Sequence, residues 1–179
     1  MKERLQAGLR RSVEAFNRLV EGLSAEDFER PLGTKWSAGQ DLRHLVKTLR
    51  AVDLALSLPL PLIRLLFGKP NRKGRSEAEL REKYRKAMGK GFQSPWIYRP
   101  GRVQVGARSS LTTRHARIAV RICRRVARMD DGQLDGYLLP HPAIGKCTLR
   151  EMVVFAGLHT EHHTRLLKAK LDGTAADEL

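Results

Sequence analysis

Three histidines at spacings suited to helices are the residues of this chain best placed to do chemistry. His159 and His163 lie four residues apart in LHTEHHTRLL, whose apolar pattern predicts a helix, so both imidazoles project from one face. The same face carries Met152 and Phe155, which places both rings inside the protein. Burying two imidazoles among apolar side chains is costly, because each has two ring nitrogens to satisfy. A shared metal ion removes that cost, and such histidine pairs commonly bind one.

A third ligand is expected from another helix. His44 is the best candidate, because it lies at the edge of an apolar arc and has small residues beside it. His115 is the competitor, since it is central on the buried stripe of a further predicted helix. His162 lies roughly 60° from the direction of His159, at the margin of the predicted core. His141 stands between two prolines and is predicted to be a loop residue that lines an entrance to the site.

Other reactive residues do not form a recognisable site. Glu161 points to solvent on the predicted helix, so HTEHH is not the H-E-x-x-H motif of metalloproteases. Cys123 and Cys147 are far apart and lack C-x-x-C spacing, which predicts neither a disulfide nor a thiolate zinc site but two buried thiols in a reducing cytosol. No nucleophilic Ser or Cys and no carboxylate pair indicates catalysis without a metal.

The chain is strongly and unevenly basic. Its formal net charge is +15, and residues 64–128 contain 19 Lys and Arg but only three acids. On the helix predicted from about Leu111 to Met129, the apolar residues form one stripe and the arginines form the opposite one. The arginines of that basic face are Arg114, Arg117, Arg121, Arg124, Arg125 and Arg128.

Three interpretations of the basic face remain open. It is a solvated surface, a binding face for nucleic acid or another polyanion, or a face neutralised by acids from the same molecule or a second subunit. The arginines have no acidic partner four residues away on their own helix, so they repel one another unless something else covers them. The basic region has few aromatic residues for base stacking, and nucleic acid is therefore not favoured.

The elements that must position these residues are predicted to be helices. Three capping boxes, each a Ser or Thr followed by Gln or Glu three residues later, start at Ser37, Ser76 and Thr148. With the apolar periodicity they predict four long helices, at about residues 2–22, 38–58, 111–129 and 149–171, and a shorter basic helix after Ser76. Apart from the brief Val103–Val105, no segment alternates like a strand.

These elements predict an all-α protein, an up-down four-helix bundle with a basic insertion at about residues 59–110 between the second and third long helices. A length of 179 residues suits a single domain covering residues 1–179. The charged N-terminus does not resemble a signal peptide, and prolines and Arg64 interrupt the longest apolar stretch, so we expect a cytoplasmic protein without a membrane span.

Two segments resemble signatures of the DinB/YfiT superfamily. KWSAGQDLRHL is similar to its second-helix signature, and HPAIGKCTLREMVVFAGLHTEHHTRLL to its fourth-helix signature; FGKPNRKGRSEAELREKYRKAM and WIYRP resemble an uncharacterised DinB-like subgroup. The resemblance implies a four-helix bundle in which His44, His159 and His163 bind one divalent ion, zinc or nickel. It also implies thiol-dependent transferases and isomerases among the relatives, and dimers as a frequent state.

Three imidazole ligands leave a coordination position for water or substrate, as in catalytic rather than closed structural sites. The leading hypothesis is therefore a metal-dependent enzyme, either a hydrolase or a thiol S-transferase, that acts on a small molecule and uses a low-molecular-weight thiol in the second case. His115 and His162 are candidates for supporting the metal ligands from outside the coordination sphere, and no general base is assigned. The alternative is a non-catalytic metal-binding module whose basic face binds nucleic acid or another polyanion.

Overall fold

The computed structural model describes residues 2–31 and 35–173, and most of them are helical. The prediction of a mainly helical protein is confirmed. Its α-helices are α1 (Lys2–Glu21), α2 (Ala25–Glu29), α3 (Ala38–Ala55), α4 (Leu60–Phe67), α5 (Glu77–Gly89), α6 (Arg108–Ala127), α7 (Asp131–Gly136) and α8 (Leu149–Leu171). Two 3₁₀ turns, η1 (Trp96–Tyr98) and η2 (Val105–Ala107), and two strands, β1 (Leu138–His141) and β2 (Gly145–Thr148), complete the described elements.

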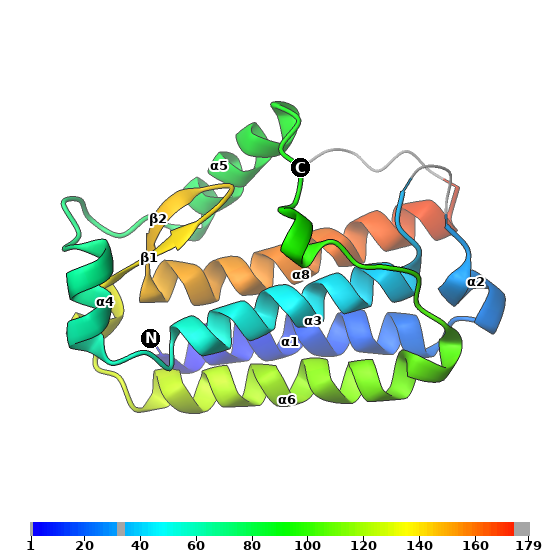
Figure 1. Cartoon of the computed structure of the whole chain (residues 1–179), viewed down its shortest axis with the longest axis horizontal. Helices are drawn as coiled ribbons and strands as arrows, with labels where there is room; N and C mark the ends of the chain where they lie inside the picture. The colour runs from blue at the N-terminus through cyan, green and yellow to red at the C-terminus, as the bar shows by residue number, and fades with distance from the viewer. Residues whose placement is uncertain (1, 32–34, 174–179) are drawn as a thin grey trace.

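The four long helices α1, α3, α6 and α8 lie side by side along the molecule (Figure 1). The amide of Asn17, late in α1, donates to the carbonyl of Thr112, early in α6, so these two helices are antiparallel. Asp53, at the end of α3, contacts Arg121 and Arg125 near the end of α6, so α3 and α6 are parallel. Lys170, at the end of α8, contacts Asp41 at the start of α3, so these two helices are antiparallel and the order of directions is up, down, down, up. It differs from the alternation of an up-down bundle, because the chain between α3 and α6 returns to the end where α3 began.

Local capping explains where several helices begin. The predicted boxes form at Ser37, Ser76 and Thr148, and Asp130 with Gln133 makes a further one that sequence analysis missed. Each box satisfies backbone N–H groups that the first helical turn leaves unpaired. Helix α6 has no side-chain cap and begins at Arg108, three residues before the predicted start.

A short β-hairpin leads into α8. Strands β1 and β2 are antiparallel, with Leu139 paired to Cys147 and His141 to Gly145. Gly145 has a φ of +74°, a conformation that favours glycine and lets the turn close. Two predictions are corrected here. The hairpin departs from the all-α prediction, and His141 is the last residue of β1 rather than a loop residue. The brief alternation at Val103–Val105 forms no strand, and Val105 begins η2.

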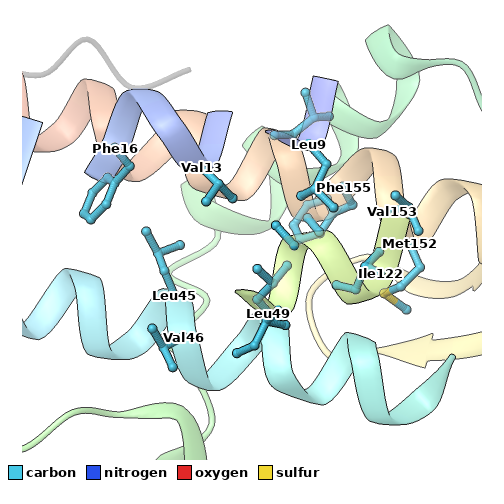
Figure 2. Packing of buried hydrophobic residues seen from close by; sticks show 14 of the residues in the cluster. Leu9, Val13, Phe16, Leu45, Val46, Leu49, Ile122, Met152, Val153 and Phe155 are labelled. Carbon is cyan, nitrogen blue, oxygen red and sulfur yellow. The ribbon is translucent and has the colours of Figure 1, made fainter. Parts of the chain in front are cut away.

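Apolar side chains from all four long helices form one buried cluster (Figure 2). Phe16 of α1, Leu45 of α3, Ile122 of α6 and Phe155 of α8 are among its members. The chain between α3 and α6 is anchored on the same cluster by its own buried residues, Ile63, Leu80, Tyr84 and Val103. Every helix that the structure describes is too short or too polar to span a bilayer.

Candidate metal centre

The imidazoles of His44, His159 and His163 converge between α3 and α8. The Nε2 atom of His159 lies 3.3 Å from Nε2 of His44 and 3.2 Å from Nε2 of His163. One ligand atom from each ring lies within 4.8 Å of the others. The structure thus brings together the three histidines that the sequence singled out. His44 and His163 are buried, and His159 is half-buried because it borders a cavity.

Two of the three rings are fixed by hydrogen bonds at their far nitrogen. Nδ1 of His44 lies 3.0 Å from the carbonyl oxygen of Tyr98, and Nδ1 of His163 lies 3.0 Å from Oδ1 of Asp41. A carbonyl or carboxylate oxygen can only accept, so both Nδ1 atoms donate. In the neutral ring the Nε2 atom then carries a lone pair, and it faces the other two histidines.

Asp41 is held in place by a second partner. It is buried on α3, one turn before His44, and its Oδ2 accepts from Nζ of Lys170 at 3.1 Å. Burial raises the pKa of Asp41 to about 6, while the ammonium of Lys170 opposes that rise. The carboxylate therefore joins the end of α8 to α3 and orients the ring of His163.

Burial keeps the three imidazoles neutral at pH 7. It lowers the pKa of His44, and the hydrogen bond to Tyr98 only partly opposes this effect. Burial and the neighbouring histidines place the pKa values of His159 and His163 well below the usual range. Neutral imidazole is the form that binds metal ions, so no proton has to be displaced before binding.

The donor set fits a divalent ion. Three imidazole nitrogens meet, and two of them must present lone pairs toward the third at distances of 3.2–3.3 Å. A proton on one ring can satisfy such contacts only in part, whereas a cation placed between the rings is attracted to all three. Imidazole suits zinc, nickel, copper and iron, and three protein ligands leave a position open. Hydrogen bonds donated by Nδ1–H, as at His44 and His163, are the usual support for histidine ligands.

Aromatic rings surround the three histidines. Trp36 lies with its ring centroid 4.9 Å from that of His44 and stacks nearly parallel to His163 at 6.5 Å. On the other side, Phe155 lies parallel to His159 at 5.9 Å. These flat aromatic contacts limit the rotation of the imidazoles.

A cavity of about 360 Å³ opens beside the three histidines. It is enclosed by α3, α8, the β-hairpin, α5 and η1, and its volume lies within the range of small-molecule sites. His141 and His162 also line it, so the structure places both at the cavity. Burial and the nearby Arg165 lower the pKa of His162 to about 4, and its ring stands edge-on to Tyr84 at 5.3 Å.

The competing ligand His115 lies elsewhere. It is fully buried on α6, where its Nδ1 lies 2.9 Å from Oδ1 of Asn17 on α1. The amide nitrogen of Asn17 donates to Thr112, so Oδ1 accepts from His115 and the imidazole carries its proton on Nδ1. Its Nε2 has no partner within the described residues. Burial lowers the pKa of His115 to about 4, and the ring joins α1 to α6 rather than reaching the candidate centre.

The two cysteines lie in the core and form no reactive site. Both thiols are free and buried, and burial raises the pKa of Cys147 to about 11, which makes it a poor nucleophile.

The basic face of α6 is partly paired within the chain. Arg121 and Arg125 each donate to a carboxylate oxygen of Asp53, at 2.9 and 3.0 Å. An acid of the same chain therefore neutralises part of the basic face. No ion pair within the described residues involves Arg114, Arg117, Arg124 or Arg128.

Sequence reasoning missed several contributors to the site. Asp41 carries a usable signal, an acid three residues before His44 on the same helix face. Tyr98 contributes only its backbone carbonyl, so its side-chain type predicts nothing about that role. Trp36 appears in the matched family segment, yet its position over two imidazoles depends on the turn before α3, which sequence alone does not define.

The comparison with known families agrees with this geometry. A family model described as the DinB superfamily matches residues 3–167, most of the chain. The chain belongs to the DinB superfamily, a group of helical proteins associated with metal binding. Searches of curated proteins and of solved structures returned no match.

Proposed function

We propose that this protein is a metal-dependent enzyme that acts on a small molecule, as a hydrolase or a thiol S-transferase. One observation carries the proposal: the Nε2 atoms of two buried histidines and one half-buried histidine converge beside a cavity large enough for a substrate. The ligands of one divalent ion, zinc or nickel, would be His44, His159 and His163. A closed structural site would need a fourth protein ligand, and none of the described Cys, Asp or Glu residues joins the cluster.

A divalent ion bound by neutral imidazoles lowers the pKa of a coordinated water or thiol, and so supplies a nucleophile near pH 7. The residues of this chain do the rest. Asp41 and the carbonyl of Tyr98 orient two of the rings, and mostly apolar side chains line the cavity beside them. His162 is neutral at pH 7 but a weak base, because its pKa is about 4. No residue stands out as a general base.

Two assays on one preparation decide between the reactions. Metal-loaded protein is mixed with a small thiol and monochlorobimane, where S-transfer forms a carbon–sulfur bond and releases chloride and the proton of the thiol. A second sample receives an activated ester and no thiol. Metal-dependent turnover in the first assay alone assigns S-transfer, and turnover in the second alone assigns hydrolysis.

The control is His159→Ala, which removes the ligand that borders the cavity, set against His115→Ala, which removes a buried histidine outside the candidate centre. Turnover should fall by at least about a hundredfold in the first variant and persist in the second if the second folds. Equal rates in parent and His159→Ala would overturn the enzymatic proposal.

One observation favours the alternative function, polyanion binding by the basic face of α6. Four arginines on the exposed side of α6 have no ion pair within the described residues: Arg114, Arg117, Arg124 and Arg128. A non-catalytic metal-binding module that uses this face to bind nucleic acid or another polyanion would present such a row. A second copy of the chain, in a homodimer, would be another partner for it.

The shared core supports a proposal about the domain organisation. We propose that residues 1–179 form one DinB-like domain, a four-helix bundle with an insertion at about residues 59–110. Ile63, Leu80 and Tyr84 of that segment join the same buried cluster as the long helices, which supports one cooperative unit.

A further inference from the structure

The walls of the cavity contain no charged side chain. Twenty-eight residues line it, and none of them is Asp, Glu, Lys or Arg, although these types make up 30% of the chain. In a protein with a net charge of +15, this exclusion separates the cavity sharply from the surface. A charged group on a ligand would find no counter-charge on these walls, and burying an unpaired charge is strongly unfavourable.

Two of the hydroxyl groups on the walls already donate to the protein's own backbone. The hydroxyl of Thr48 donates to the carbonyl of Leu45, and that of Thr160 donates to the carbonyl of Ala156. Because each hydroxyl proton is used in a hydrogen bond within its own helix, neither threonine can donate it to a ligand in the cavity. Most of the remaining lining residues are leucine, alanine, proline, methionine and phenylalanine, and Ser94, Tyr84 and Tyr98 add three further hydroxyl groups.

One polar group on the wall has a fixed direction. Nδ1 of His141 lies 3.2 Å from the backbone nitrogen of Ala143 and 3.4 Å from that of Ile144. Backbone N–H groups can only donate, so Nδ1 accepts and the neutral ring carries its proton on Nε2. The ring packs at 4.4 Å against Phe155, which in turn lies parallel to His159. His141 is therefore a donor on the wall near the candidate centre.

These contacts define the kind of molecule that fits. We infer that the substrate is a small, uncharged and largely apolar body, an aryl or alkyl group, with a single anionic head that lies at the three histidines. The inference rests on the proposed function for the head and on the cavity walls for the body. An anionic head is favoured because three neutral ligands leave the charge of a divalent ion uncompensated. Nε2–H of His141 donates to a polar atom next to that head.

The test compares three thiols that share one head and differ in the tail: 2-phenylethanethiol, 3-mercaptopropionate and cysteamine. Each is titrated into cobalt-loaded protein, and the thiolate charge-transfer band gives its affinity. We expect 2-phenylethanethiol to bind at least about tenfold more tightly than the two charged thiols. A charged thiol that binds as tightly as 2-phenylethanethiol would overturn the inference, and so would cobalt-loaded protein that binds none of them.

A matched pair of variants checks where the preference arises. Met88→Lys places a cation on the wall, and Leu54→Lys places one on an exposed position outside the cavity. Met88→Lys should bind 3-mercaptopropionate several-fold more tightly than the parent, while Leu54→Lys should not. An equal gain in both variants would trace the effect to general charge and contradict the inference.

A metal-free arm separates this inference from the proposed function. By calorimetry on protein without metal, 2-phenylethanol should bind detectably, and 2-phenylethylamine, an ammonium ion at pH 7, should not. If cobalt is not retained, the proposed function fails while this arm still tests the walls. If cobalt is retained but the amine binds as well as the alcohol, the inference about the substrate fails while the metal site stands.

Discussion

Nδ1 of His163 lies 3.0 Å from Oδ1 of Asp41, and this contact joins a candidate metal ligand on α8 to a buried carboxylate on α3. Asp41→Asn keeps an oxygen that can accept the hydrogen bond but removes the charge. We expect metal affinity to fall by about 10- to 100-fold, the usual effect of changing a residue that supports a histidine ligand. Competition with a chelator of known affinity measures it.

The control for that variant is Asp53→Asn. Asp53 is a second buried aspartate on α3, and its partners are Arg121 and Arg125 rather than a histidine. The control should lower stability and leave metal affinity unchanged. A comparable loss of affinity in both variants would mean that Asp41 acts through stability alone.

The second prediction concerns the metal itself. Purified without a nickel resin, the protein should contain about one divalent ion per chain by elemental analysis. His44→Ala, His159→Ala and His163→Ala should each lose it, because each removes one of the converging nitrogens. His141→Ala should retain it, since His141 lines the cavity but lies outside that cluster. Retention in His44→Ala together with loss in His115→Ala would reassign the third ligand.

Much of the site could be predicted because it depends on helical periodicity. The i,i+4 spacing of His159 and His163 determines that both rings share a face, and the capping box at Thr148 determines where their helix begins. His44 could be proposed but not separated from His115 by pattern alone, because both lie on buried stripes. Only the packing of α3 against α8, with α6 turned toward α1 and α3, decides between them.

Other features depend on contacts between distant segments and escape a reading of the sequence. The strands that pair Leu139 with Cys147 are four residues long, too short to show alternation. The acid that neutralises Arg121 and Arg125 lies on another helix, so their own helix gives no sign of it. The parallel course of α3 and α6 follows from where the long connection ends, which no local pattern encodes.

The third prediction concerns pH. Burial lowers the pKa of His115 from 6.5 to about 4. Between pH 6.5 and pH 4, His115 is therefore protonated in the unfolded chain but neutral in the folded one. The folded-state pKa is the lower one, and stability therefore falls as pH drops from about 6.5 to 4. His115→Leu removes this group. The difference in free energy of unfolding between the variant and the parent should shift by about 2 kcal/mol in favour of the variant from pH 7 to pH 5. Urea denaturation at both pH values measures it. A pH-independent difference would contradict it.

The fourth prediction contrasts two glutamates of α8. Glu151 is buried and bound by Arg72 and Arg75, whereas the side chain of Glu161 is 43% exposed and its one ion pair among the described residues is with Arg81. Burial alone would raise the pKa of Glu151, but the hydrogen bonds from the two arginines outweigh it and lower the value to about 2. Glu151→Gln should lower the free energy of unfolding by about 3 kcal/mol, and Glu161→Gln by less than about 1 kcal/mol.

Chemical denaturation at pH 7 measures both glutamate variants. The contribution of Glu151 is present above its unfolded pKa, about 4.5, and is lost as pH falls toward 2, so the difference between parent and Glu151→Gln should shrink in acid. Similar losses in the two variants would show that the buried pairs do not tie the segment before α5 to α8.

The last prediction tests the basic face of α6. Arg114, Arg117, Arg124 and Arg128 are exposed and have no ion pair within the described residues, so they are the arginines available to an external polyanion. Changing these four to Gln should remove most binding to heparin at low salt. Binding by the parent should weaken steeply as salt rises, because a polyanion releases its counterions when cations replace them.

The control for the four-arginine variant changes Arg121 and Arg125 instead. Both arginines form ion pairs with Asp53, so their loss leaves a buried carboxylate without these partners and should lower the free energy of unfolding by about 3 kcal/mol. It should change heparin binding much less than loss of the four exposed arginines. If the four-arginine variant still binds with the same salt dependence, the polyanion site lies in the basic segment between α3 and α6. If the parent does not bind even at low salt, the row is a solvated surface, and the metal centre remains the only functional site supported among the described residues.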